Sequence, residues 1–379
     1  RALFDLGESH EIFKKEGIEE YSNYQKKNEN KPLDKGVAFN LVEKLLQMNN
    51  KKEKVLVTGA SGFIALHCIS ELLQSGYKVK GSLRDPSREI EVRNSFDKKL
   101  GDENLEICYL DLLNDDGWED VSSDCDYLFH IASPFIIQEP KDEKIIIDPA
   151  LEGTLRALRA AKKNNIKKVV LTSSMASIAY GNNKDVCNHE DWTDLSKNVG
   201  TYIKSKTLAE KAAWDFIHNH SDNSFVLTTI HPGMVFGPLL SDDIEGASAS
   251  LINNLIKGKF PALPDLYFTV VDVRDVAKLH VEALSNKGSD NKRIIATSQS
   301  GIAFLEISRI LLKLGYDKAP TNLIPNKVIN SLAPFNKEMR STASMIKRGC
   351  YSVDLSQTIS LFNWDPISLQ KTLKDMTDS

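Results

Sequence analysis

The stretch VLVTGASGFIA, residues 55–65, decides the fold of this chain. Three apolar residues of a short strand lead into a turn with two glycines, and an apolar helix begins directly after the turn. Gly59 permits the sharp turn, and Gly62 lets the backbone approach a pyrophosphate held by the free amides of the helix N-terminus. Ala65 stands in the place of a third glycine and still permits close packing of helix on strand. This order favours a dinucleotide site, although glycine turns also occur for structural reasons alone.

Short apolar runs alternate with amphipathic helices from residue 54 onward. Such alternation is typical of a parallel sheet with helices on both faces. We predict an α/β fold, a doubly wound parallel sheet of the Rossmann type, with a smaller C-terminal substrate lobe and an N-terminal helical extension. The predicted strands are residues 54–58, 77–83, 104–110, 126–132, 167–173 and 225–231, and the predicted helices are residues 63–75, 88–100, 143–164 and 203–220.

The sequence predicts three segments of different character. Residues 1–50 are rich in Glu, Lys and Asn and form an N-terminal extension, in which only 36–48 has helical periodicity. Residues 51–235 are expected to form the dinucleotide-binding domain, to which 267–298 is expected to return. Residues 236–379, with several prolines in loops, form the substrate-binding lobe that closes over the carboxyl edge of the sheet. The extension either packs on its own catalytic domain or docks to a partner protein.

The composition is that of an ordinary globular protein. Of the 379 residues, 41% are hydrophobic and 26% charged, and 48 Lys and Arg against 52 Asp and Glu give a net charge of −4. This balance disfavours a nucleic acid or an anionic membrane as partner. The longest stretch without a charged residue, 223–241, contains two prolines and two glycines. No membrane span is therefore predicted.

Cysteine usage and the N-terminal residues bear on the compartment. Five scattered cysteines without a C-x-x-C pair predict reduced thiols and no metal site. Charged residues throughout the first twenty positions leave no apolar segment for a secretory signal. We expect a cytoplasmic protein. A mitochondrial matrix protein whose presequence has been removed is the alternative, because the chain begins with Arg1.

The end of the second predicted strand, GSLRD at residues 81–85, indicates which dinucleotide is bound. An acidic residue there commonly binds the ribose 2′-hydroxyl of NAD, whereas the 2′-phosphate of NADP favours Arg. Arg84 offers a planar set of donors that suits a phosphate. Asp85 is then its salt-bridge partner or, as the alternative, the hydroxyl ligand, and a solvated surface Arg is the structural alternative. We predict NADPH or NADP as cofactor in preference to NADH.

Tyr202 and Lys206 lie four residues apart in TYIKSKTLAEK, residues 201–211, and a helix places both on one face. A phenol with an ordinary pKa of about 10 is a poor proton donor at neutral pH, and an adjacent ammonium lowers that pKa. Lys206 can also reach a cofactor ribose. A surface pair is the usual meaning of this spacing. The position after the glycine turn and along the sheet is what favours catalysis.

A row of hydroxyls, Thr172-Ser173-Ser174, follows the fifth predicted strand at its carboxyl edge. A hydroxyl there can hydrogen-bond a substrate carbonyl beside the phenol. We select Ser174, and Ser173 is the neighbour with which it could be confused. The alternative is that these residues merely end a strand and begin a turn.

Together these segments resemble the extended short-chain dehydrogenase/reductase superfamily. Within it, the chain is similar to the branch of dihydroflavonol reductase, cinnamoyl-CoA reductase and NADPH-dependent aldehyde and ketone reductases. The resemblance covers residues 54–379. Ala65, the Glu190-Asp191-Trp192 turn, residues 205–211 and residues 271–277 indicate the branch. The segments that carry the resemblance are residues 58–65, the Arg84 turn, 110–112, 130–134, 172–174, 202–206 and 231–238.

The resemblance implies roles for individual residues. It makes Tyr202 the general acid and Lys206 the residue that lowers the pKa of Tyr202 and binds a ribose. Ser174 would be the hydroxyl that orients the carbonyl, and the hydride would come from the nicotinamide. His231 stands where many relatives have Asn or another residue, and its contact with substrate is open. The implied cofactor contacts are Thr58, Gly59, Ser61, Gly62, Phe63, Ile64, Arg84, Asp111, Leu112, Ala132, Ser133, Tyr202, Lys206, Pro232, Gly233 and Val235.

These observations predict an NADPH-dependent carbonyl reductase that converts an aldehyde or ketone into an alcohol by hydride transfer. One alternative keeps the fold and changes the chemistry, to a hydroxysteroid dehydrogenase or a nucleotide-sugar epimerase. The other is a non-catalytic accessory subunit that docks to a larger assembly through residues 1–50. The expected partners are a small-molecule carbonyl substrate and, for residues 1–50, a protein. The residue types do not name the substrate.

Overall fold

The computed structural model describes residues 7–27, 53–96, 104–134, 139–182, 184–220, 225–241 and 246–379. Helix α1 (Gly7–Lys27) belongs to one compact unit and the sheet to another, so each is described by itself. Backbone angles at Gly17 (φ 86°, ψ −172°) interrupt α1. The periodicity of the sequence does not predict α1, because charged residues are frequent in it and Gly17 interrupts the helical period. The helix predicted over 36–48 lies outside the described residues.

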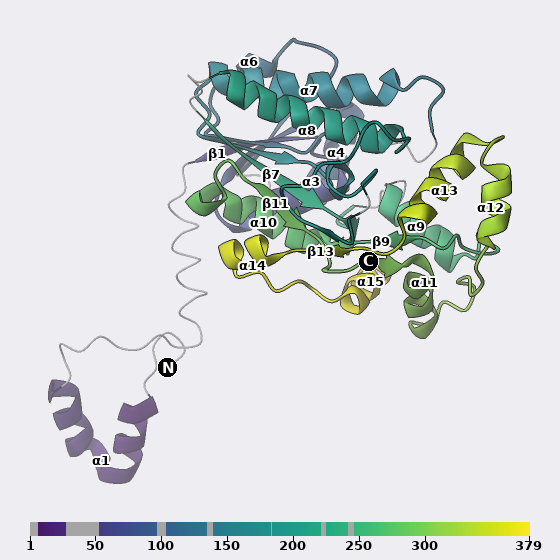
Figure 1. Ribbon diagram of the computed structural model, residues 1–379. Helices are drawn as coiled ribbons and strands as arrows, with labels where there is room; N and C mark the ends of the chain where they lie inside the picture. Colours follow the sequence, from purple (N-terminus) through teal and green to yellow (C-terminus); the bar gives the residue numbers. More distant parts are fainter. Residues whose placement is uncertain are drawn as a thin grey trace. The chain divides into compact units, whose positions relative to one another are not determined.

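Within the described residues, seven parallel strands form one sheet in the order β11-β7-β5-β4-β1-β2-β3 (Figure 1). The chain runs outward from β1 to β3 and then returns to the other side of β1 with β4. Ligands of doubly wound sheets bind at the carboxyl ends of the strands beside such a reversal. The predicted fold class is therefore confirmed. The strands are β1 (Lys54–Thr58), β2 (Lys78–Leu83), β3 (Leu105–Tyr109), β4 (Tyr127–His130), β5 (Lys168–Thr172), β7 (Val226–Pro232) and β11 (Arg293–Ala296).

Helices cover the sheet and bury its apolar side chains. Helices α7 (Lys144–Lys163) and α8 (Thr201–Asn219) pack against each other along the sheet, and α10 (Val273–Ser285) packs on β5 and β7 from the other side (Figure 1). Small residues of α7 and α8 let these helices approach the strands closely. One apolar core joins them to the sheet; it includes Leu56, Leu128, Val169 and Leu227 of the strands and Ala157, Ala161 and Ala213 of the helices.

Residues 267–298 contribute strands to three sheets. β11 forms the edge of the main sheet beside β7. β9 (Tyr267–Phe268) pairs with β12 (Ile302–Ala303), and β10 (Val270–Asp272) pairs with β8 (Met234–Phe236), both outside the main sheet. The predicted domain boundary at residue 235 stays a prediction.

The C-terminal residues build a second apolar core of their own. Side chains of α9 (Ala247–Ile256), α11 (Phe304–Lys313) and α15 (Leu369–Asp378) meet there around Phe236 and Leu263. No helix in the described part of the chain is long and apolar enough to cross a membrane. The remaining elements are α3 (Phe63–Gln74), α4 (Glu89–Asn94), α6 (Trp118–Ser122), α12 (Asn326–Leu332), α13 (Lys337–Arg348), α14 (Ser356–Phe362), β6 (Val186–Cys187), β13 (Ser352–Val353), and the 3-10 turns η1 (Pro86–Arg88), η2 (Met175–Ser177) and η3 (Lys287–Ser289).

Candidate functional site

The glycine turn between β1 and α3 has the geometry of an anion site. Gly59 has φ +70°, and a Cβ atom there would lie 3.1 Å from Cα and Cβ of Ala132, so a larger residue would be strained and crowded. Helix α3 begins at Phe63 and carries no acidic residue in its first turn. Its first backbone amides have no acceptor within the helix and point toward the turn. The predicted contacts Ser61, Gly62, Phe63 and Ile64 lie in this turn and the first helical residues.

Thr58 ties the glycine turn to the neighbouring strand β4. Its Oγ1 atom accepts hydrogen bonds from the amides of Ile131 and Ala132, both at 3.0 Å, and lies 3.1 Å from Nδ1 of His130. Burial lowers the pKa of His130 to about 3, so this ring is neutral. The Thr58 hydroxyl therefore holds the backbone of Ile131 and Ala132 in place beside the glycine turn.

Arg84 lies directly after β2 and is exposed. Within the described part of the chain it makes no hydrogen bond or salt bridge, so its guanidinium is available to an anion. Asp85 is engaged elsewhere, because its Oδ1 accepts the amide of Ser87 at 2.9 Å and caps η1. Hydrogen bonds from Ser87 lower the pKa of Asp85. Of the two neighbours, Asp85 is therefore engaged in its own turn, and Arg84 is the one without a partner among the described residues.

Asp111 and Leu112 follow β3 at the same edge. The Asp111 carboxylate accepts the amide of Leu113 at 2.8 Å, and the Leu112 carbonyl accepts Nη1 of Arg156 at 2.8 Å. Arg156 lies on α7, so this loop is held to the helix layer. The predicted adenine-side pair is thus placed at the carboxyl end of the sheet.

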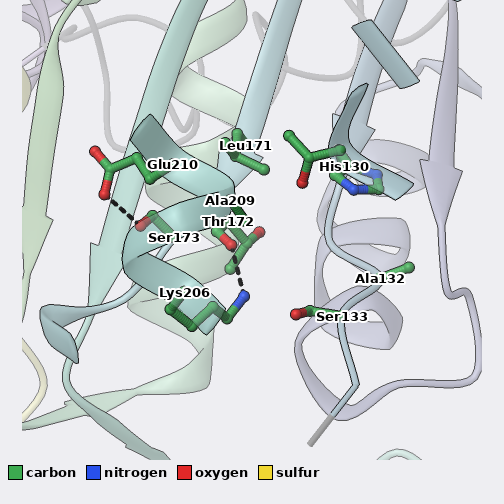
Figure 2. Close-up of a pocket in the computed structure, with 10 residues that line it drawn as sticks. His130, Ala132, Ser133, Leu171, Thr172, Ser173, Lys206, Ala209 and Glu210 are labelled. Carbon is green, nitrogen blue, oxygen red and sulfur yellow. Dashed lines mark hydrogen bonds between the residues drawn. The ribbon is translucent and has the colours of Figure 1, made fainter. Parts of the chain in front are cut away.

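Ser133 follows β4 and carries a hydroxyl that points toward Lys206 (Figure 2). Its Oγ atom is buried and has no hydrogen-bond partner among the described residues. A buried hydroxyl without a partner is costly and commonly indicates a missing water or ligand. His130, Ala132, Ser133 and Lys206 line one small cavity of about 10 Å³.

Ser174 and Tyr202 come together where β5 ends and α8 begins. The Ser174 Oγ accepts the amide of Ala176 at 3.1 Å, and the Ser174 side chain lies close enough to the Tyr202 phenol to influence its pKa. Burial raises the pKa of Tyr202 to about 12; the Ser174 side chain opposes that rise, and nearby Tyr180 adds to it. The phenol therefore holds its proton at neutral pH.

Lys206 lies one helix turn after Tyr202 and is buried. Its Nζ donates to the carbonyl oxygen of Thr172 at 3.1 Å. Burial lowers the pKa of Lys206 to about 8, and the charge of Glu210 opposes that lowering. The expected lowering of the phenol pKa by Lys206 is not found: the pKa of Tyr202 is raised, because burial outweighs other influences on this phenol.

The strand β7 ends at Pro232, and Gly233 and Val235 follow it. The Gly233 amide donates to the carbonyl of Ala296 at 3.1 Å, and a Cβ there would collide with Thr269 and Thr297. Val235 is buried in β8.

His231, whose contact with substrate was open, is fully buried. Its Nε2 lies 2.8 Å from Oε1 of Glu210, and its Nδ1 lies 3.3 Å from the Ile294 carbonyl oxygen. Both ring nitrogens are directed into the protein. The structure therefore assigns His231 to the core.

The sequence analysis missed two buried charges beside the site, Glu210 and Arg293. Glu210 is 1% exposed and Arg293 9% exposed, and their side chains form a salt bridge with Nε 2.7 Å from Oε1. An acidic residue two helix turns after Tyr202, on the face that also carries Lys206, is the pattern that would have identified Glu210. No local sequence pattern identifies Arg293, because it lies on β11, 83 positions after Glu210. Among the described residues, no group of three His, Cys, Asp or Glu side chains could hold a metal ion.

The residues at the sheet edge fit a dinucleotide phosphate. The family model described as the NAD dependent epimerase/dehydratase family matches residues 55–296, which contain this whole edge. The chain belongs to this family. The predicted extended short-chain dehydrogenase/reductase branch is confirmed by its relatives. A second family model, described as 5′-nucleotidase, matches residues 1–61.

Two curated relatives are similar over most of their length. The cinnamoyl-CoA reductase CAD2 of Medicago truncatula is 38% identical over 279 residues, which cover 71% of this chain and 83% of the relative. The NADPH-dependent methylglyoxal reductase GRE2 of Saccharomyces cerevisiae is 34% identical over 265 residues, which cover 64% of this chain and 77% of the relative.

Solved structures share the fold. Yeast methylglyoxal/isovaleraldehyde reductase Gre2 complexed with NADPH matches with a TM-score of 0.72 and 28% identity, covering 86% of this chain and 97% of that one. A UDP-glucose 4-epimerase from Thermotoga maritima matches with a TM-score of 0.67 and 19% identity, covering 86% of this chain and 97% of that one. The second likeness shows the fold alone.

Proposed function

We propose that this chain is an NADPH-dependent carbonyl reductase that converts an aldehyde or ketone into the alcohol. The observation that carries the proposal is the arrangement of Ser174, Tyr202 and Lys206: a half-buried phenol beside the Ser174 side chain, with a buried ammonium one helix turn away. The curated relatives described above support it, because both are named as reductases and one as NADPH-dependent.

The cofactor would be held by residues already placed at the sheet edge. Arg84 would bind the 2′-phosphate, and the first amides of α3 would bind the pyrophosphate. The Ser133 hydroxyl and the Lys206 ammonium are the donors available to a ribose, because each has hydrogen-bonding capacity left over. When bound, NADPH supplies the hydride that reduces the carbonyl carbon.

Tyr202 and Ser174 act on the carbonyl oxygen. Ser174 donates a hydrogen bond to that oxygen, and Tyr202 donates its proton as the oxygen gains negative charge. The raised pKa of Tyr202 keeps the proton on the phenol until then. Lys206, when charged, stabilises the phenolate that remains. Lys206 is buried and Ser174 and Tyr202 are half-buried, which limits the access of water and strengthens these interactions.

Some predictions rest on the sequence alone. The cytoplasmic location, the substrate-binding lobe and a protein partner for residues 1–50 stay predictions. The epimerase alternative shares the fold with a solved epimerase and draws no further support from the described residues.

Cofactor titration with a carbonyl panel tests the proposal. NADPH and NADH are titrated by fluorescence, and aldehydes and ketones are then followed at the nicotinamide absorbance. We expect NADPH to bind at least about tenfold more tightly than NADH, since a charge-assisted bond to a phosphate contributes about 1.5–3 kcal/mol. Arg84→Ala should weaken NADPH alone.

Three outcomes separate the interpretations. NADPH-dependent reduction of a carbonyl supports the proposal. Binding of NADPH without turnover on any carbonyl contradicts it and favours the accessory subunit. Equal binding of both cofactors, unaffected by Arg84→Ala, contradicts the assignment of Arg84.

A further inference from the structure

Glu210 is a buried carboxylate on the helix that carries Tyr202 and Lys206. It lies one helix turn beyond Lys206 and two beyond Tyr202, so all three share a face of α8. Side chains from four other segments, and Trp214 of α8 itself, donate to its two oxygens. The donors are Ser173 Oγ at 2.6 Å, Ser177 Oγ at 2.5 Å, His231 Nε2 at 2.8 Å, Arg293 Nε at 2.7 Å, Trp214 Nε1 at 3.2 Å and Thr229 Oγ1 at 3.4 Å.

Two of these donors stand on either side of Ser174. Ser173 precedes it directly and bonds Glu210, as Figure 2 shows. Ser177 Oγ lies within hydrogen-bond distance of both Oε2 of Glu210 and the Ser174 carbonyl oxygen, at 2.5 Å and 2.8 Å. The backbone of Ser174 is therefore held to α8 from both sides. Because Tyr202 belongs to α8, the same bonds set the position of Ser174 relative to the phenol.

Arg293 extends the cluster to the turn ahead of Tyr202. Its guanidinium lies 3.9 Å from the centre of the Trp192 ring, and its Nη1 donates to the carbonyls of His189 and Asp191 at 2.8 Å and 2.6 Å. The Glu190-Asp191-Trp192 turn, which indicated the reductase branch, is thereby joined to Glu210 on the catalytic helix. Arg293 of β11 thus links these two motifs, and Lys211 of α8, 5.4 Å from the centre of the Trp192 ring, adds a direct contact between them.

A buried cluster of charges is a costly way to stabilise a core. Apolar side chains of similar volume often serve stability as well or better. Directional bonds from fixed donors, in contrast, define positions closely. The cluster lies against Ser174 and on the face of Lys206, which is where a small displacement would disturb proton transfer.

We propose that Glu210 is a positioning residue, which holds Ser174 and the Trp192 turn at fixed places relative to Tyr202 through Ser173, Ser177 and Arg293. This inference rests on the proposed carbonyl reductase function. Glu210 touches no reacting atom in it. Its contribution is to keep the Ser174 and Tyr202 hydroxyls directed at the same carbonyl oxygen.

Glu210→Gln tests the inference, because Gln keeps the volume and one acceptor oxygen and removes the charge. We expect kcat to fall about 10- to 100-fold, since misplacement by about 1 Å costs about that much. NADPH affinity and KM should stay within about twofold of the parent, because Glu210 contacts neither ligand. Lys168→Met is the matched control: it breaks the buried Lys168–Asp290 pair at the opposite end of β5. That control should lose stability and keep kcat.

The pH profile gives a readout that a purely structural residue would not move. The charged and titratable groups around this face are Lys206, Tyr202 and Glu210 on α8, His130 at the end of β4, His231 on β7 and Arg293 on β11. Removing the Glu210 charge removes the influence that raises the pKa of Lys206. The alkaline decline of kcat/KM should then begin at lower pH in Glu210→Gln than in the parent.

The outcomes distinguish this inference from the proposed function. If the unchanged chain binds NADPH but reduces no carbonyl, the proposed function fails and this inference with it. If the parent is active and folded Glu210→Gln has parental kcat and pH profile, the positioning role alone is overturned. Should Glu210→Gln not fold, Ser173→Ala carries the test, because it removes one bond to Glu210. Its kcat should fall several-fold with NADPH affinity unchanged, and a parental kcat overturns the inference.

Discussion

A buried lysine lies at each end of the β5 region, and the two are satisfied differently. At the amino end, Lys168 Nζ donates to Asp290 Oδ1 at 2.6 Å, the Ala283 carbonyl at 2.6 Å and Ser289 Oγ at 3.0 Å. At the carboxyl end, Lys206 Nζ has one acceptor among the described residues, the Thr172 carbonyl at 3.1 Å. An ammonium has three donors. Lys168 uses all of them within the protein, whereas Lys206 has donors left for a ligand.

The difference teaches how to separate a structural charge from a functional one. Both lysines are buried and the pKa of each is lowered by burial, to about 8 for Lys206. Burial and a shifted pKa therefore do not distinguish them. The unused donors of Lys206, together with the unpartnered Ser133 hydroxyl beside it, mark the carboxyl end as the place for ligands.

The largest expected effect is a loss of catalysis on substitution at the carboxyl end of the β5 region. Tyr202→Phe removes the proton donor and keeps the ring, so kcat/KM should fall about 10³-fold or more. NADPH affinity should change less than about twofold, because the phenol oxygen serves the substrate in this proposal. Steady-state kinetics and fluorescence titration measure both. Turnover near the parental rate would show that another group donates the proton.

A substitution at the amino end of the β5 region should lower stability and leave catalysis unchanged. Lys168→Met leaves Asp290 without its buried partner and should lower the free energy of unfolding by roughly 3 kcal/mol, near the low end for a broken buried pair. The low end is expected because the Asp290 side chain is 32% exposed. Urea denaturation measures the loss. A large fall in kcat of the folded variant would contradict the separation of the two ends.

A smaller effect is expected from pH. The pKa of Lys206 is lowered to about 8, so its ammonium is present below that pH and is lost as the pH rises through it. If the charged form assists Tyr202, kcat/KM should decline up to about tenfold per pH unit above pH about 8. A rate profile from neutral to alkaline pH measures this. A profile that stays flat well beyond that pH would mean that Lys206 acts without its charge.

Local patterns predicted the sheet well because they are set by neighbouring residues. The run from Val55 to Ala65 combines a strand period, a glycine turn and a helix period, and β1 and α3 begin where it predicts. Arg84 was likewise placed by its position after a strand. Helix α1 was missed, because it is mostly polar and Gly17 interrupts its helical period. The pairing of β10 with β8 was missed because it forms only when residues 270–272 fold back beside residues 234–236.

The sequence by itself determined the fold class, the family branch and the candidates Ser174, Tyr202 and Lys206. Each of these depends on the spacing of residues within one helix or strand, or at its end. Tertiary structure alone decided the environment of those groups. Burial raised the pKa of Tyr202 against the expectation from its neighbour Lys206. The tertiary fold also joined Glu210 to Arg293, which lies 83 positions later in the chain. Solvation and long-range pairing depend on what the folded chain places around a residue, and spacing in sequence carries no record of that.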